Sequence, residues 1–151
     1  MSEARSWLVA RAAQTPRREA LRFCGESWDY ARLLEEALSL AAQLEFEAGV
    51  GRGDVVAALL PSGLDWALLL HALRSRGATL LPVNLRLTPS EIGHQIRDAG
   101  ARLLVHGADV EALAQESHAS RVALVEGRLA TPVAGQTASP GLRHPELAAG
   151  D

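Results

Sequence analysis

The sequence contains no lysine, because all 15 of its basic residues are arginine. This absence excludes a lysine Schiff base, a lysine nucleophile and the lysine of a Walker A phosphate loop from these residues. Cys24 is the only cysteine, so an intrachain disulfide is excluded and a reducing compartment is expected. No apolar run approaches ~18 residues, and the first residues lack the layout of a signal peptide. We therefore expect a cytoplasmic chain without a membrane span.

The sequence also lacks a large excess of charge of either sign. The 151 residues carry a formal net charge of −3, so we expect no general electrostatic attraction to DNA, RNA or an anionic membrane. Apolar residues make up 48% of the chain, which is enough for one domain with its own core. No Gly-x-Ser-x-Gly string occurs, which leaves a serine hydrolase of that kind unsupported.

Apolar periodicity predicts a helix, a short hairpin and a long helix in the first third. The helix covers residues 5–14, the hairpin strands cover 20–23 and 27–29 around a turn at 25–26, and the long helix covers 30–47. Asp29 is the expected N-cap of the long helix, and Gly49 is placed to end it in the left-handed conformation.

Strands and helices then alternate regularly. The expected strands are 54–60, 78–83, 102–106 and 122–125, and the expected helices between them are 64–76, 89–99 and 109–115. Thr88 and Glu91 have the spacing of a capping box at the start of the second of these helices. This alternation predicts an α/β fold with a mainly parallel sheet, and the continuously apolar strands predict helices on both of its faces.

The last 25 residues have a different character. Residues 127–151 contain four glycines and three prolines and show no apolar period, which indicates a linker or irregular extension with at most one short strand around Val133. We therefore divide the chain into an α/β subdomain at 1–126 and a linker at 127–151.

Three loops follow the expected parallel strands at the sheet edge where open α/β sheets bind ligands, at Ser62-Gly63, Val83-Asn84 and Gly107-Ala108. Asn84 and Arg86 are the candidate binding residues, because an arginine fork can hold a carboxylate or phosphate. The alternative is a capped loop in which Arg86 pairs with a neighbouring acid or carbonyl.

Other motifs are better explained by structural roles than by functional ones. The glycines at 49–53 follow a helix and open a strand, the reverse of a phosphate-cradling loop, so we expect a helix stop and a tight turn. His94 and Asp98 share a helix face but supply only two ligands, too few for a metal site, so none is predicted. His71 has no acid placed to orient it, and we expect it to be a half-buried helix residue.

The order and spacing of several strings resemble the AMP-forming acyl-CoA ligases of the adenylate-forming superfamily. The strings are WLVARA at 7–12, TP at 15–16, WDYARLL at 28–34, GDVVA at 53–57, LPVN at 81–84, RLTPSEI at 86–92 and DAGA at 98–101. Asp29 stands where the family usually has threonine, and Arg32 stands where it usually has glutamate. The opening is most similar to the o-succinylbenzoate–CoA ligases of menaquinone synthesis.

The resemblance implies a two-step reaction on a small-molecule carboxylate. The carboxylate attacks ATP to give an acyl-adenylate and pyrophosphate, and coenzyme A then displaces AMP to form a thioester, with Mg²⁺ as the metal. The family's phosphate loop ending in Pro-Lys-Gly and its C-terminal lysine have no counterpart here, so no catalytic residue is assigned. The chain is interpreted as an N-terminal subdomain, inactive alone, whose partner is the remainder of the ligase. Such ligases are often dimeric, so a homodimer is one expected state.

A stand-alone, non-catalytic α/β binding or interaction module is the alternative. It would bind a small anion at the loops after Pro61, Val83 and His106, and it would close its own core. A subdomain of a larger ligase should instead leave apolar faces uncovered and tend to self-associate.

Overall fold

The computed structural model describes residues 6–130 of the chain. The elements follow the chain as α1 (Trp7–Gln14), β1 (Glu19–Phe23), β2 (Glu26–Asp29), α2 (Tyr30–Ala48), β3 (Val55–Leu59), α3 (Leu64–Ser75), β4 (Thr79–Pro82), α4 (Pro89–Asp98), β5 (Leu103–His106), a 3-10 helix (Ala108–Val110), α5 (Glu111–Glu116), β6 (Arg121–Val125) and β7 (Arg128–Leu129). No helix within this part of the chain is long and apolar enough to cross a membrane.

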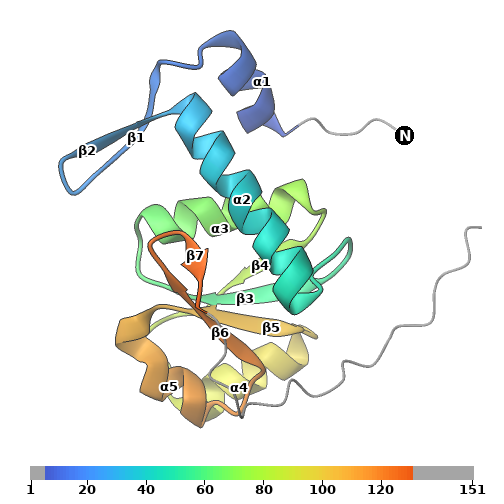
Figure 1. Ribbon diagram of the computed structural model, residues 1–151. Coiled ribbons are helices and arrows are strands. Elements are labelled where there is room, and N and C mark those ends of the chain that lie inside the picture. The colour runs from blue at the N-terminus through green and yellow to red at the C-terminus, as the bar shows by residue number, and fades with distance from the viewer. Residues whose placement is uncertain (1–5, 131–151) are drawn as a thin grey trace, which may run out of the picture.

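The main sheet has the strand order β4-β3-β5-β6-β7 (Figure 1). The first four of these strands pair in parallel, and only β7 is antiparallel, against β6. The prediction of a mainly parallel sheet is confirmed. The register places Ala57 of β3 between Leu81 and Leu104 of its two neighbours, so β3 lies inside the sheet.

Helices cover both faces of this sheet, as the apolar strands predict (Figure 1). Successive side chains of β3 point to opposite faces, because side chains alternate along a strand. Val56 and Ala58 therefore belong to the core under α2 and α3, whereas Ala57 and Leu59 belong to the core under α4. All four are at most 1% exposed, which explains why the strand reads as a continuous apolar run.

The predicted caps of α2 and α4 are confirmed, whereas the helix predicted at 109–115 is a 3-10 helix at Ala108–Val110 followed by α5 at Glu111–Glu116. The side chain of Asp29 accepts a hydrogen bond from the backbone N–H of Arg32 at 2.8 Å, and Gly49 ends α2 with a φ of 65°. The side chains of Thr88 and Glu91 form the complete capping box at the start of α4.

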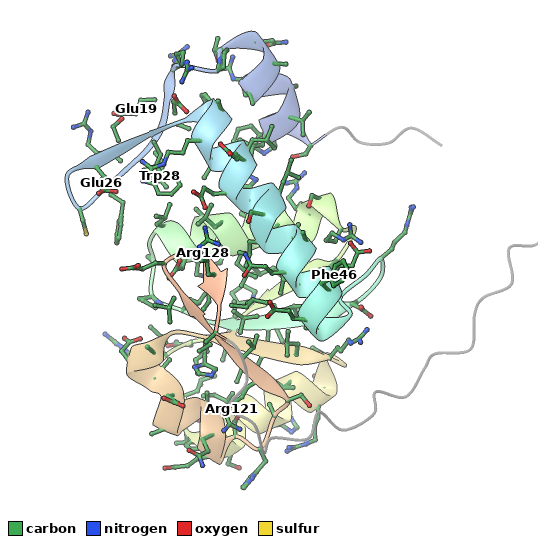
Figure 2. The ribbon with its side chains drawn as sticks, in the orientation of Figure 1. Glu19, Glu26, Trp28, Phe46, Arg121 and Arg128 are labelled. Carbon is green, nitrogen blue, oxygen red and sulfur yellow. The ribbon has the colours of Figure 1, made fainter. Side chains whose placement is uncertain are left out.

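The hairpin β1–β2 pairs only with itself and projects from the body (Figure 1). Its turn is formed by Cys24 and Gly25, so the return strand begins at Glu26, one residue before the predicted start. Trp28 lies beside α2 at the base of the hairpin (Figure 2). It is buried in the core, and the guanidinium of Arg32 lies 3.8 Å from the centre of its ring.

One strand lies in the segment predicted to be irregular. Residues 128–129 form β7, and Leu129 is buried in the core beneath α2. Two paired residues are too few to produce a visible period, so the sequence could not indicate this strand. The short strand expected around Val133 lies outside the described residues.

Candidate functional site

A cleft of about 400 Å³ opens at the carboxyl ends of β3, β5 and β6. Its walls are the loop at 60–65 after β3, the loop at 107–109 after β5 and residues 124–126 at the end of β6, together with Phe23 of β1. The three strands are parallel, so their carboxyl ends meet at one edge of the sheet. Two of the three loops singled out from the sequence, after Pro61 and after His106, thus come together here.

Phe23 brings the hairpin to this edge. Its ring contacts the loop after β3 so closely that a Cβ atom built on Gly63 would lie 3.0 Å from the ring. Phe23 is 41% exposed and Val125 is 44% exposed, which are high values for large apolar side chains. Leu60 and Leu124, which are at most 5% exposed, form an apolar floor, and Phe23 and Val125 are two apolar side chains at the rim.

The charged groups at the cleft are all acidic. Asp65 is partly buried at the start of α3, and Asp109 and Glu126 are exposed. Burial raises the pKa of the Asp65 carboxyl above its usual range, and the nearby charge of Glu126 acts in the same direction. A hydrogen bond that Asp65 accepts from the backbone N–H of Gly127, at 2.7 Å, partly opposes this rise.

No arginine or histidine lines this cleft within the described residues. An apolar floor with carboxylates at its rim repels phosphates and carboxylates and favours cations or apolar groups. The cleft accordingly does not fit ATP, coenzyme A or a carboxylate substrate.

The candidate residues Asn84 and Arg86 lie after β4, outside the cleft. The Asn84 side-chain oxygen accepts a hydrogen bond from the backbone N–H of Arg86 at 2.9 Å, which caps the loop. Arg86 is exposed, and its guanidinium forms no ion pair among residues 6–130. The capped loop is confirmed, whereas the pairing of Arg86 with a neighbouring acid is not observed.

The histidines among residues 6–130 form no metal site. His71 is 8% exposed rather than half-buried, and its ring packs edge-on against Trp7 with centroids 5.3 Å apart. Burial lowers the pKa of His71 below its usual range, and the charge of Arg74 adds to this effect. His94 is exposed on α4, and no group of three His, Cys, Asp or Glu side chains in the described part of the chain could hold a metal ion.

The sequence interpretation missed the acidic cleft. Asp65 is separated from Gly127 by 62 residues, and Asp109 and Glu126 follow different strands. The available signal was the placement of an acid shortly after each of three parallel strands, which predicts that the acids share one sheet edge.

The chain is similar to known proteins both in its sequence and in its fold. The family model described as AMP-binding enzyme matches residues 8–146. The 2-succinylbenzoate–CoA ligase of Geobacillus kaustophilus is 40% identical over 100 residues, which are 66% of this chain and 20% of that protein. The feruloyl-CoA synthase of an Amycolatopsis species is 36% identical over 146 residues, which are 96% of this chain and 28% of that protein.

Solved structures show the same relationship. The o-succinylbenzoate coenzyme A synthetase of Bacillus subtilis in complex with AMP superposes with a TM-score of 0.73 and 27% identity, over 78% of this chain and 31% of that one. A long-chain fatty-acid CoA ligase of Rhodopseudomonas palustris, named as putative in its description, superposes with a TM-score of 0.71 and 29% identity, over 79% of this chain and 32% of that one. The chain spans about a fifth to just over a quarter of the length of the curated relatives that it matches. Because the family model matches nearly the whole length of this chain, the chain belongs to the AMP-binding enzyme family.

Proposed function

We propose that this chain is the N-terminal part of an ATP-dependent, AMP-forming acyl-CoA ligase. The observation that carries the proposal is the family match over residues 8–146, on the fold shared with solved ligases. In the complete reaction, a carboxylate oxygen attacks the α-phosphorus of ATP and pyrophosphate leaves. The thiol of coenzyme A then attacks the acyl carbon, and AMP leaves with the bonding electrons.

The proposed carboxylate is o-succinylbenzoate. The relative with the highest identity reported above is named as a 2-succinylbenzoate–CoA ligase, and the B. subtilis enzyme of similar fold carries the same substrate in its name. The competing substrate is ferulate, because the feruloyl-CoA synthase matches more of the chain. The test below therefore includes both acids.

The cleft at the carboxyl ends of β3, β5 and β6 does not fit ATP with Mg²⁺. The sequence has no lysine to contact a phosphate, residues 6–130 hold no cluster of metal-ligating side chains, and the one apolar cleft described above is acidic at its rim. We therefore assign ATP, Mg²⁺ and the chemical steps to the remainder of the ligase. The part of this chain is to form one wall of the large domain.

Arg86 is the residue proposed to contact an anionic ligand. It follows β4 on a loop fixed by the Asn84 cap, and its guanidinium is exposed. A fixed loop presents the arginine fork with little loss of conformational freedom on binding. Arg86→Gln in an active ligase should raise a substrate KM, with Arg97→Gln, an exposed arginine on α4, as the matched control.

The experiment that tests the function is a chimera. Residues of this chain replace the 100 matched residues of the Geobacillus ligase, and ATP–pyrophosphate exchange is measured with o-succinylbenzoate and with ferulate. We expect exchange that depends on o-succinylbenzoate, and no exchange from the isolated 151-residue chain. A well-folded chimera without exchange would contradict the ligase assignment. Pyrophosphate exchange by the purified isolated chain would contradict its expected inactivity. Exchange with ferulate alone would identify ferulate, rather than o-succinylbenzoate, as the substrate.

A further inference from the structure

The buried histidine of α3 is covered by a side chain of α1. The ring of His71 is packed edge-on against Trp7, with centroids 5.3 Å apart, and the residue is only 8% exposed. Trp7 also meets the ring of Tyr30 of α2 edge-on, with centroids 6.4 Å apart. The outer side of Trp7 is in solvent, because this residue is 47% exposed. Movement of α1 away from α2 and α3 would therefore bring His71 into water.

The surroundings of His71 disfavour a charged ring. Its Nδ1 atom has no hydrogen-bond partner, and none of the ion pairs among residues 6–130 involves this histidine. The charge of Arg74, on the same helix, acts against protonation. The other ionisable groups of the cluster are Arg11 of α1, whose guanidinium lies 6.0 Å from the ring centre of Tyr30, and the Tyr30 hydroxyl group of α2. A proton on His71 would thus place an unpaired positive charge in a buried site that already contains cations.

The attachment of α1 depends on apolar and aromatic contacts. Within residues 6–130, no hydrogen bond or ion pair joins the helix to another element. Besides the contacts of Trp7 and Arg11, the helix buries only Leu8 and Ala12. The chain that follows is fixed, because the carbonyl of Pro16 accepts a hydrogen bond from the backbone N–H of Ala31 at 3.1 Å. The helix can therefore separate from the body while the next segment stays anchored.

We propose that α1 is a pH-sensitive cover, docked on α2 and α3 while His71 is neutral and released when His71 is protonated. Release lets water solvate the charged ring, which the docked helix prevents. The pKa of His71 returns to its ordinary value of 6.5 in the released state and is lower in the docked one, so the balance shifts toward release as the pH falls below 6.5. This inference does not depend on the proposed function.

Hydrogen exchange on the 151-residue chain tests the release. Between pH 7.5 and 5.5, and after correction for the intrinsic pH dependence of exchange, protection of the backbone amides at 11–14 should fall by up to about tenfold. This limit is the effect of one proton with a released-state pKa of 6.5. The amides at 92–98 of α4 should keep their protection. An equal fall in both helices would indicate global unfolding, and unchanged protection at 11–14 would mean that α1 stays docked; either result overturns the proposal.

Two variants of α1 test whether Trp7 is the cover. In an NMR titration of the His71 ring, Trp7→Ala should raise the pKa of His71 toward 6.5, because it opens the site to water. Val9→Ala, at an exposed apolar position of the same helix, is the matched control and should leave that pKa lowered. Protected amides at 92–98 show that each variant remains folded. Equal titration curves in the two variants would overturn the role of Trp7.

Two neutral replacements test whether His71 is the group that responds to pH. His71→Phe and His71→Gln differ in size and in apolar character, but neither can take up a proton in this range. In both, protection of the amides at 11–14 should be the same at pH 7.5 and 5.5, whatever its level. His94→Phe, at an exposed position on α4, is the control and should keep the fall at low pH. A fall that persists in both His71 variants would overturn the proposal.

Discussion

The carboxylate of Asp65 accepts a hydrogen bond from the backbone N–H of Gly127 at 2.7 Å, across 62 residues of sequence. This contact ties the first turn of α3 to the turn between β6 and β7. A second contact acts in the same region, because the side-chain oxygen of Gln43 accepts a hydrogen bond from the backbone N–H of Leu129 at 2.9 Å. Two side chains of the helical layer thus attach the last strands of the described chain to the core.

Replacement of Asp65 should weaken this attachment. Asp65→Ala leaves the partly buried N–H of Gly127 without its acceptor, and we expect the free energy of unfolding to fall by about 1–2 kcal/mol. Urea denaturation followed by circular dichroism measures the change. Asp109→Ala, at an exposed position, is the control and should stay within about 0.5 kcal/mol of the unchanged protein. Equal losses in the two variants would contradict a role for the hydrogen bond.

Alanine substitutions at Gly127 and Gly100 can distinguish the effect of backbone strain from the effect of steric contact. Both have positive φ, at 77° and 64°, but a Cβ atom on Gly127 would lie 2.9 Å from Cδ1 of Leu68, whereas Gly100 faces open space. We expect Gly100→Ala to lower the free energy of unfolding by about 1 kcal/mol from backbone strain alone. Gly127→Ala should lower it by roughly 2–3 kcal/mol, because it adds overpacking against the core.

The double variant Gly127→Ala/Leu68→Val checks this separation. It shortens the side chain that the new methyl group would meet, so it should be less destabilised than the sum of its two single variants. Losses that add up fully would show that the contact with Leu68 contributes nothing.

Local chemistry in the sequence predicts most of the fold. Asp29, Gly49 and Thr88 act on atoms a few residues away, so their roles as caps and stops can be read from spacing alone. The run at Val55–Leu59 predicts a strand buried on both faces, and alternation with helices then predicts the parallel sheet. These inferences need no knowledge of distant contacts.

The cleft and the last strand depend on distant contacts instead. Asp65, Asp109 and Glu126 meet only because three strands end at one edge, and β7 forms against β6 with help from Gln43 of α2. Phe23 reaches the cleft from a hairpin whose orientation no local pattern specifies. The sequence predicts too little burial for His71 for the same reason. Its ring packs against Trp7, which lies on a different helix, α1.

The capping box of α4 should make a measurable contribution. The hydroxyl of Thr88 accepts a hydrogen bond from the N–H of Glu91 at 3.3 Å, and the Glu91 carboxylate accepts one from the N–H of Thr88 at 2.8 Å. Thr88→Ala removes the first of these, so the free energy of unfolding should fall by about 1 kcal/mol. Ser90→Ala, at an exposed position in the same turn, is the control and should cause little change in urea denaturation. A similar loss in both would show that the cap is not the cause.

Acid should destabilise the fold through His71. Burial against Trp7 lowers the pKa of His71 below the ordinary value of 6.5, and its Nδ1 atom has no hydrogen-bond partner among the described residues. Below pH 6.5 the unfolded chain therefore takes up a proton at this residue before the folded chain does. The stability that His71 contributes is complete above pH 6.5 and is lost as the pH falls through the lowered, folded-state pKa.

His71→Phe keeps an aromatic ring against Trp7 and removes the titrating group. Between pH 7.5 and 5.5, the free energy of unfolding from urea denaturation should therefore fall less in this variant than in the unchanged protein, because only the latter gives up the His71 contribution. His94→Phe, at an exposed position on α4, is the matched control and should follow the unchanged protein. A parallel decline in His71→Phe and the unchanged protein would assign the acid sensitivity to other groups.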